Sequence, residues 1–288
     1  MSPSYAYPEV IVSTDWVASH LNDPSIVIVE INTNLIEGYD TGHVPSSIGW
    51  SLHIDLEDRV RRDIPRIEQM ESLLKMAAIS KETTIVLYGD GNNRSATWAF
   101  WILKIYRHED VRIMDGGRQK WLKEGRELST DSVSRAPSHY QVATPDRSIR
   151  AMRDYIIKNL GKQGFKLLDT RTIEEFTGEL SSAPGIPQSE IYRNGRIPGA
   201  IHIAWDDAVS LDGSFRPVEE LRKLYEEQDL SSSDEVVPYC RLGVRASYSW
   251  FVLKYLLGYP RVRNYDGSWT EWGNSVGVPV DSDEPSTE

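Results

Sequence analysis

Short apolar runs alternate along the chain with longer segments in which apolar side chains recur every three or four positions. The β-branched runs at residues 26–31 and 84–88 predict buried strands, and the segments 67–78 and 95–106 predict helices. Strands that alternate with helices are typical of an α/β fold with a mainly parallel sheet. The pattern therefore predicts an α/β protein.

The same order of elements occurs twice in the chain. A spacing of 151 residues separates Gly89 from Cys240 at corresponding strand ends, whereas 139 residues separate Glu30 from Asp169 earlier in each half. The difference predicts an insertion of about 14 residues in the second half, around residues 181–189. A repeat of this length indicates a duplicated domain, because solenoid repeats have periods of roughly 20–50 residues.

We therefore expect two tandem domains, at residues 8–128 and 149–282, each a mainly parallel sheet flanked by helices. The segment 129–148 is expected to be a linker, because Ser, Thr, Asp and Pro are frequent in its first part. A chain of 288 residues is long enough for each domain to bury its own core.

Composition narrows the classes of function. A net charge of -11 argues against nucleic-acid and anionic-membrane partners. No apolar run approaches the roughly 18 residues of a membrane span, and no signal peptide is visible. One cysteine and six scattered histidines give neither a disulfide nor a zinc-ligand cluster. We expect a cytoplasmic protein without metal or cofactor.

The only cysteine, Cys240, stands between an apolar strand at residues 236–239 and the helix that follows. A lone cysteine is more often a buried small hydrophobe than a nucleophile. Here Arg241 and Arg245, together with the amides of a helix N-terminus, favour the thiolate. Gly243 permits the backbone to close around the sulfur, and successive N–H groups in such a loop bind anions. The surroundings therefore favour a reactive thiolate.

Loop length distinguishes two kinds of cysteine chemistry. A cysteine phosphatase has five residues between its cysteine and its arginine, which makes a cradle for phosphate. Four residues separate Cys240 from Arg245, and Ala246 holds the position that a phosphatase requires. The tighter loop favours a smaller group, such as one sulfur atom on Cys240. A cysteine-dependent phosphatase or an arsenate reductase is thus a more distant alternative.

Three motifs make the chain resemble the rhodanese family, and more narrowly the tandem-domain thiosulfate sulfurtransferases. They are Cys-Arg-Leu-Gly-Val-Arg at 240–245, Gly-Arg-Ile-Pro-Gly-Ala-Ile-His at 195–202 and Asn-Tyr-Asp-Gly-Ser-Trp-Thr-Glu-Trp at 264–272. The resemblance implies two rhodanese-like domains. It also implies an enzyme that moves the sulfane sulfur of thiosulfate, through a persulfide on Cys240, to cyanide or to a small-molecule or protein thiol.

The resemblance implies substrate binding by an arginine in the segment Asp169-Thr170-Arg171. Arg171 is expected to contact the sulfonate end of thiosulfate, and the alternative is a salt bridge with Asp169 or Glu175. Asp169 and Trp269 are expected to support the site, with Trp269 as a pocket wall or a core residue.

The loop arginines carry the prediction of the sulfur donor. Thiosulfate-using members of the family carry a basic residue at the position of Arg241, and a dianion gains more from a cationic loop than a monocarboxylate does. 3-Mercaptopyruvate sulfurtransferase is the near alternative. Arg245 is expected to bind substrate or to stabilise the loop. The remaining members of the active-site loop are Leu242, Gly243 and Val244.

The first half departs from the second at the decisive position. Gly89 stands where Cys240 stands in the second half, so the first half cannot form a persulfide. Arg94 corresponds to Arg245, which suggests that this arginine partly serves the fold. We therefore expect a noncatalytic first domain and a catalytic second domain. The remaining alternative, a noncatalytic binding module throughout, is disfavoured because the cationic loop retains its cysteine.

Overall fold

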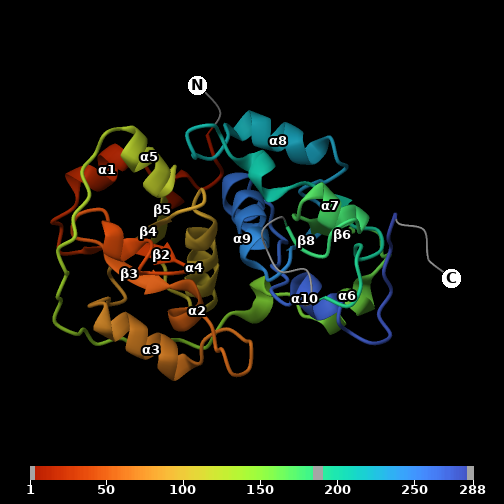
Figure 1. Cartoon of the computed structure of the whole chain (residues 1–288), viewed down its shortest axis with the longest axis horizontal. Coiled ribbons are helices and arrows are strands. Elements are labelled where there is room, and N and C mark those ends of the chain that lie inside the picture. The colour runs from red at the N-terminus through yellow and green to blue at the C-terminus, as the bar shows by residue number, and fades with distance from the viewer. Residues whose placement is uncertain (1–3, 184–190, 284–288) are drawn as a thin grey trace. The chain divides into compact units, whose positions relative to one another are not determined.

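The computed structural model describes residues 4–183 and 191–283 (Figure 1). Contacts within the chain define two domains. The first comprises Pro8–Asp146 and the short segment Ser210–Phe215, and the second comprises Met1–Tyr7, Arg147–Val209 and Arg216–Glu288. The predicted insertion at residues 181–189 lies mostly outside the described residues.

A five-stranded parallel sheet in the order β1-β5-β4-β2-β3 forms the centre of the first domain (Figure 1). Every residue of β2 is buried, as in a strand covered on both faces. The elements are η1 (Pro8–Val10), β1 (Ile11–Val12), α1 (Thr14–Ser19), β2 (Ile26–Asn32), η2 (Tyr39–Thr41), β3 (Ile48–Ser51), α2 (Leu52–Asp55), α3 (Ile67–Met76), β4 (Thr84–Gly89), α4 (Arg94–Ile105), β5 (Val111–Met114) and α5 (Gly117–Lys123).

The second domain has a parallel sheet in the order β7-β6-β8. Parallel bridges extend it, because Val236 pairs with Val262 and Arg150 pairs with Asn264. The extended order matches that of the first domain. The elements are η3 (Arg147–Ile149), α6 (Arg153–Asn159), β6 (Phe165–Asp169), α7 (Ile173–Thr177), β7 (Ile201–His202), η4 (Trp205–Ala208), α8 (Val218–Glu226), β8 (Glu235–Tyr239), α9 (Val244–Phe251), the π-helical turn η5 (Val252–Leu256) and α10 (Ser268–Trp272).

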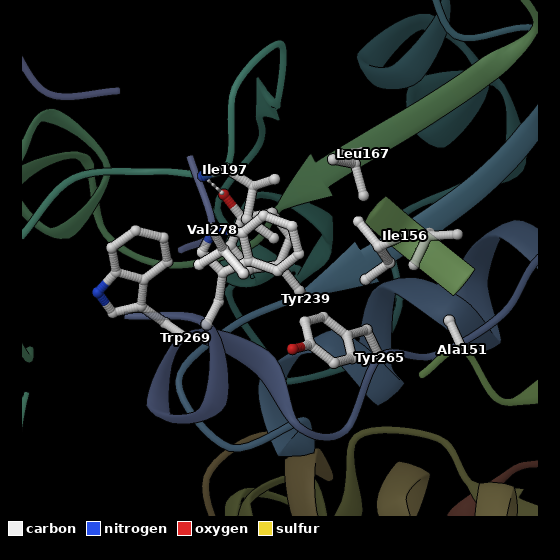
Figure 2. Packing of buried hydrophobic residues seen from close by; sticks show 10 residues of the cluster. Ala151, Ile156, Leu167, Ile197, Tyr239, Tyr265, Trp269 and Val278 are labelled. Carbon is white, nitrogen blue, oxygen red and sulfur yellow. Dashed lines mark hydrogen bonds between the residues drawn. The ribbon is translucent and has the colours of Figure 1, made fainter. Parts of the chain in front are cut away.

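Aromatic side chains fill the core of the second domain beneath its sheet. Figure 2 shows Tyr239 and Tyr265 among aliphatic residues such as Ile156 and Leu167, with Trp269 in the same cluster. The dashed line in Figure 2 is the hydrogen bond that the backbone N–H of Ile197 donates to the Tyr239 hydroxyl at 3.1 Å. This bond ties the segment around Ile197 to the end of β8, beside the loop that carries the cysteine.

The prediction of a duplicated α/β fold is confirmed. Most of the segment predicted as a linker, residues 129–148, lies on the first domain in the structure. His43 and Ser129 form an antiparallel bridge, and buried Tyr140 hydrogen-bonds the His108 ring at 2.9 Å. Among the described residues, no helix is both long and apolar enough to cross a membrane.

Candidate active site

Cys240 follows the last residue of β8, and three residues separate it from the start of α9. Gly243 has φ 90°, in the left-handed region that glycine adopts without strain, and this conformation turns the chain into the helix. The predicted turn from strand to helix, and the need for a glycine in it, are both confirmed. The sequence thus places the sulfur at the N-terminus of a helix.

The sulfur of Cys240 lies inside its own loop. The backbone N–H of Gly243 donates to the cysteine Sγ at 3.1 Å, and the cysteine is only 1% exposed. Three loop neighbours, Arg241, Leu242 and Val244, are half-buried.

The first residues of α10 hold the backbone of the loop. The N–H of Trp269 donates to the Cys240 carbonyl at 2.9 Å, and the N–H of Thr270 donates to the Arg241 carbonyl at 3.0 Å. In a trans peptide the N–H points opposite to the carbonyl. The N–H groups of Arg241 and Leu242 therefore point away from α10.

Arg245 lies in a buried ion pair with Glu175 of α7. Its two terminal nitrogens meet the two carboxylate oxygens at 2.6 and 2.9 Å, and the side chains are 10% and 0% exposed. Burial alone would lower the pKa of Arg245, but the bonds to Glu175 and the nearby Cys240 raise it above its usual value. Glu175 also accepts the N–H of Thr172 at 3.1 Å and so caps α7. These contacts correspond to the loop-stabilising role that was the alternative to substrate binding for Arg245.

Arg171 is fully enclosed by the second domain. Its Nη2 donates to the Asp169 carboxylate and to the Gly195 carbonyl, both at 2.6 Å, and its guanidinium lies 4.6 Å from the Trp269 ring centre. The side chain is 0% exposed, and Nη1 has no hydrogen-bond partner among the described residues. The ion pair with Asp169, which was the alternative to substrate binding for Arg171, is present and fully buried. Trp269 packs against Arg171 in the core.

The corresponding loop of the first domain has no sulfur and a different backbone conformation, because Gly91, Asn92 and Asn93 all have positive φ, whereas among residues 240–244 Gly243 alone does. At the position of Cys240, the N–H of Gly89 donates to the side-chain oxygen of Asn93 at 3.1 Å. The Asn93 amide also donates to the Met114 carbonyl at 2.7 Å, and the residue is 1% exposed. The side chain of Asn93 therefore bridges Gly89 and Met114, as the Ser268 hydroxyl bridges their counterparts Cys240 and Tyr265.

Both domains bury a carboxylate at the end of the second sheet strand and pair it with an arginine, but the arginines come from different positions. In the first domain Arg118 donates a hydrogen bond to the Glu30 carboxylate at 2.8 Å, and Arg118 is the counterpart of Trp269. In the second domain Asp169 receives Arg171, whose counterpart is Asn32. A buried carboxylate–arginine pair is thus present both in the domain with the cysteine and in the domain without it.

Two side chains at the site were missed by sequence reasoning. The Ser268 hydroxyl accepts the Cys240 N–H at 3.0 Å, and the Thr270 hydroxyl donates to the Arg241 carbonyl at 2.8 Å. A signal for Ser268 was present, because its counterpart 151 residues earlier is Gly117. Thr270 has no comparable signal.

Comparisons with known proteins agree with this geometry. The model of the rhodanese-like domain matches residues 13–124 and 152–275. The chain is 50% identical over 279 residues to a Thermus thermophilus protein named "Sulfur carrier protein TtuD", with 96% of this chain and 98% of that protein covered. It is 43% identical over 276 residues to a "Putative thiosulfate sulfurtransferase" of Mycolicibacterium smegmatis, with 96% and 99% covered.

A solved structure shows the same fold. The anaerobic ergothioneine biosynthesis enzyme from Chlorobium limicola matches with a TM-score of 0.85 and 24% identity, covering 98% of this chain and 72% of that one. At this identity the likeness concerns the fold alone.

Proposed function

The chain belongs to the rhodanese-like domain family, and on that premise we propose that it is a thiosulfate sulfurtransferase with Cys240 as its nucleophile. The observation that carries the proposal is the bond from the Gly243 N–H to the cysteine sulfur at 3.1 Å, inside a loop whose carbonyls are held by α10. A thiolate fixed in this way is prepared for covalent catalysis.

The proposed reaction has two steps. In the first step the Cys240 thiolate attacks the outer sulfur of thiosulfate, the sulfur–sulfur bond of the donor breaks, and sulfite leaves with the bonding electron pair. The enzyme then carries a persulfide, Cys–S–S⁻. In the second step an acceptor attacks the terminal sulfur, and the cysteine sulfur leaves as a thiolate. With cyanide the product is thiocyanate, and no external oxidant or reductant is consumed.

The loop amides account for stabilisation of the persulfide. The N–H groups of Arg241 and Leu242 point away from α10, and that of Gly243 reaches the sulfur. Fixed N–H donors stabilise developing negative charge without reorganisation, as in an oxyanion hole. The near-complete burial of Cys240 supports protection of the persulfide from water.

Donor binding is assigned to Arg241. Arg245 and Arg171 are engaged by Glu175 and Asp169, and their side chains are 10% and 0% exposed, whereas Arg241 is half-buried. We therefore assign Arg241 to the sulfonate of the donor and the two buried arginines to the scaffold. 3-Mercaptopyruvate is the second candidate donor, since it supplies sulfur by the same attack but carries one negative charge less.

The acceptor is a thiol or cyanide. The Thermus relative is named a sulfur carrier protein, which favours a protein among the thiol acceptors of this chain. A carrier needs a persulfide that survives until the acceptor arrives. The burial of Cys240 fits that requirement.

Intact mass after incubation with thiosulfate tests the proposal. Wild type should gain about 32 Da, the mass of one sulfur atom, and lose it again on addition of cyanide. The matched Cys240→Ser variant should gain nothing, because serine cannot form a persulfide. If wild type gains no such mass with thiosulfate but gains it with mercaptopyruvate, the donor would be mercaptopyruvate instead of thiosulfate. No gain with either donor would refute sulfur transfer.

A further inference from the structure

Ser268 has a backbone conformation that is unusual for its residue type. Its φ of 53° lies in the left-handed region, where a residue with a Cβ is strained, and the residue is fully buried. The corresponding residue of the first domain is Gly117, with φ 54°. Glycine adopts this conformation freely. The second domain therefore keeps a strained residue where the first has an unstrained one.

The Ser268 hydroxyl makes two hydrogen bonds that explain its retention. It donates to the carbonyl of Tyr265 at 2.6 Å and accepts the backbone N–H of Cys240 at 3.0 Å. The first bond uses the hydroxyl hydrogen, so the oxygen lone pairs are left for the cysteine N–H. The nucleophile is thus anchored through its own backbone.

The first domain satisfies the same N–H group in another way. The N–H of Gly89 is accepted by the side chain of Asn93, which also donates to the carbonyl of Met114, the counterpart of Tyr265. The counterpart of Asn93 in the second domain is Val244, which has no acceptor on its side chain. The acceptor for this N–H therefore comes from the N-cap residue of α4 in the first domain and from α10 in the second.

We propose that Ser268 is a positioning residue for sulfur transfer. Its hydroxyl satisfies the N–H of Cys240 from outside the loop, so that the interior can hold the cysteine sulfur and the transferred sulfur. The residue acts through the cysteine backbone, and strain at Ser268 is tolerated because glycine would lack the hydroxyl. This inference rests on the sulfur transfer proposed for Cys240.

The variant Ser268→Gly separates positioning from folding. Glycine removes the hydroxyl but accepts φ 53° without strain, so the thermal midpoint should stay within about 5 °C of wild type. The rate of sulfur loading at saturating thiosulfate should fall about tenfold, as expected for one lost hydrogen bond to the reacting residue. The half-saturating thiosulfate concentration should change little, because the donor contacts remain.

Two further variants serve as controls. Ser268→Ala keeps the strain and lacks the hydroxyl, so it should load sulfur as slowly as Ser268→Gly and melt at a lower temperature. Thr270→Val removes a hydroxyl two residues away, but the Arg241 carbonyl keeps the bond from the Thr270 N–H at 3.0 Å. Its loading rate should fall by less than about threefold.

The outcomes distinguish this inference from the proposed function. If wild type takes up sulfur and Ser268→Gly does so within about twofold of its rate, positioning by Ser268 is refuted while sulfur transfer stands. A Ser268→Gly variant that unfolds would refute it as well, because the hydroxyl would then serve the fold. If wild type takes up no sulfur from either donor, the proposed function fails first.

Discussion

The buried pair of Glu175 and Arg245 gives the sharpest test of how the loop is held. Replacing Glu175 by Gln keeps the shape of the side chain and removes its charge. Arg245 would then be left with an uncompensated charge, because both of its terminal nitrogens bond this carboxylate and it is only 10% exposed. Breaking a buried ion pair on one side costs about 3–5 kcal/mol.

Hydrogen exchange followed by mass spectrometry measures this loss of stability in the second domain, which contains the pair. Peptides from α9 should lose protection by about two to four orders of magnitude in their slowest amides, since each tenfold corresponds to about 1.4 kcal/mol. Peptides from α4 report on the first domain and should remain protected. They provide an internal control in the same sample.

Two comparisons make the result interpretable. Glu219→Gln disrupts the exposed pair of Glu219 and Arg222, with side chains 58% and 46% exposed, and should change protection by less than tenfold. The double variant Glu175→Gln/Arg245→Met should lose less protection, on the free-energy scale, than the two single variants added together, because it leaves no charge unpaired. Unchanged protection of α9 in Glu175→Gln would refute the reasoning.

Three further predictions follow from single residues. Arg241→Gly should lower kcat/KM for thiosulfate about 10- to 100-fold, which corresponds to the loss of a hydrogen bond to a charged group. The loss of kcat/KM for mercaptopyruvate should be smaller. Equal losses in steady-state assays with both donors would argue against donor selection by Arg241. Gly243→Ala, at φ 90°, and the control Gly161→Ala, at φ 74°, should each lower the free energy of unfolding by about 1 kcal/mol or more. Only Gly243→Ala should slow sulfur loading, measured by intact mass. Burial raises the pKa of Asp115 to about 6, so ionisation opposes folding, and stability of the first domain should fall by at most about 3 kcal/mol as pH rises from about 4 to 6. Asp115→Asn should flatten that dependence in thermal melts, and an unchanged slope would assign it to other groups.

Long periodic elements were predictable from the sequence, and short ones were not. The predicted strands at 26–31 and 84–88 differ from β2 and β4 by one residue at the C-terminal end. The strand β1 has only two residues, so it has no period that a pattern could reveal. It forms because it pairs with β5. The helix α8 was missed although its apolar residues have helical spacing.

At the site, local chemistry was predictable and long-range partnering was not. The repeat placed Cys240 and the turn at Gly243, because both depend on residues adjacent in sequence. The burial of Arg171 could not be inferred, since the carbonyl of Gly195 and the ring of Trp269 enclose it from distant segments. From the sequence alone, Arg171 and Glu175 could each serve a ligand or the scaffold, and only their partners in the structure distinguish these two roles.

Close contacts in the first domain restrict what can replace Gly89 and Gly117. A Cβ at Gly89 would lie 2.6 Å from the Ile31 carbonyl oxygen, so a cysteine there requires the backbone to shift. A Cβ at Gly117 would lie 2.3 Å from the Asn93 side-chain oxygen, so the counterpart of Ser268 cannot be introduced unless the Asn93 side chain moves. A second nucleophile at Gly89, anchored as Cys240 is, would therefore need changes at Gly89, Gly117 and Asn93 together, which is difficult to reach one residue at a time.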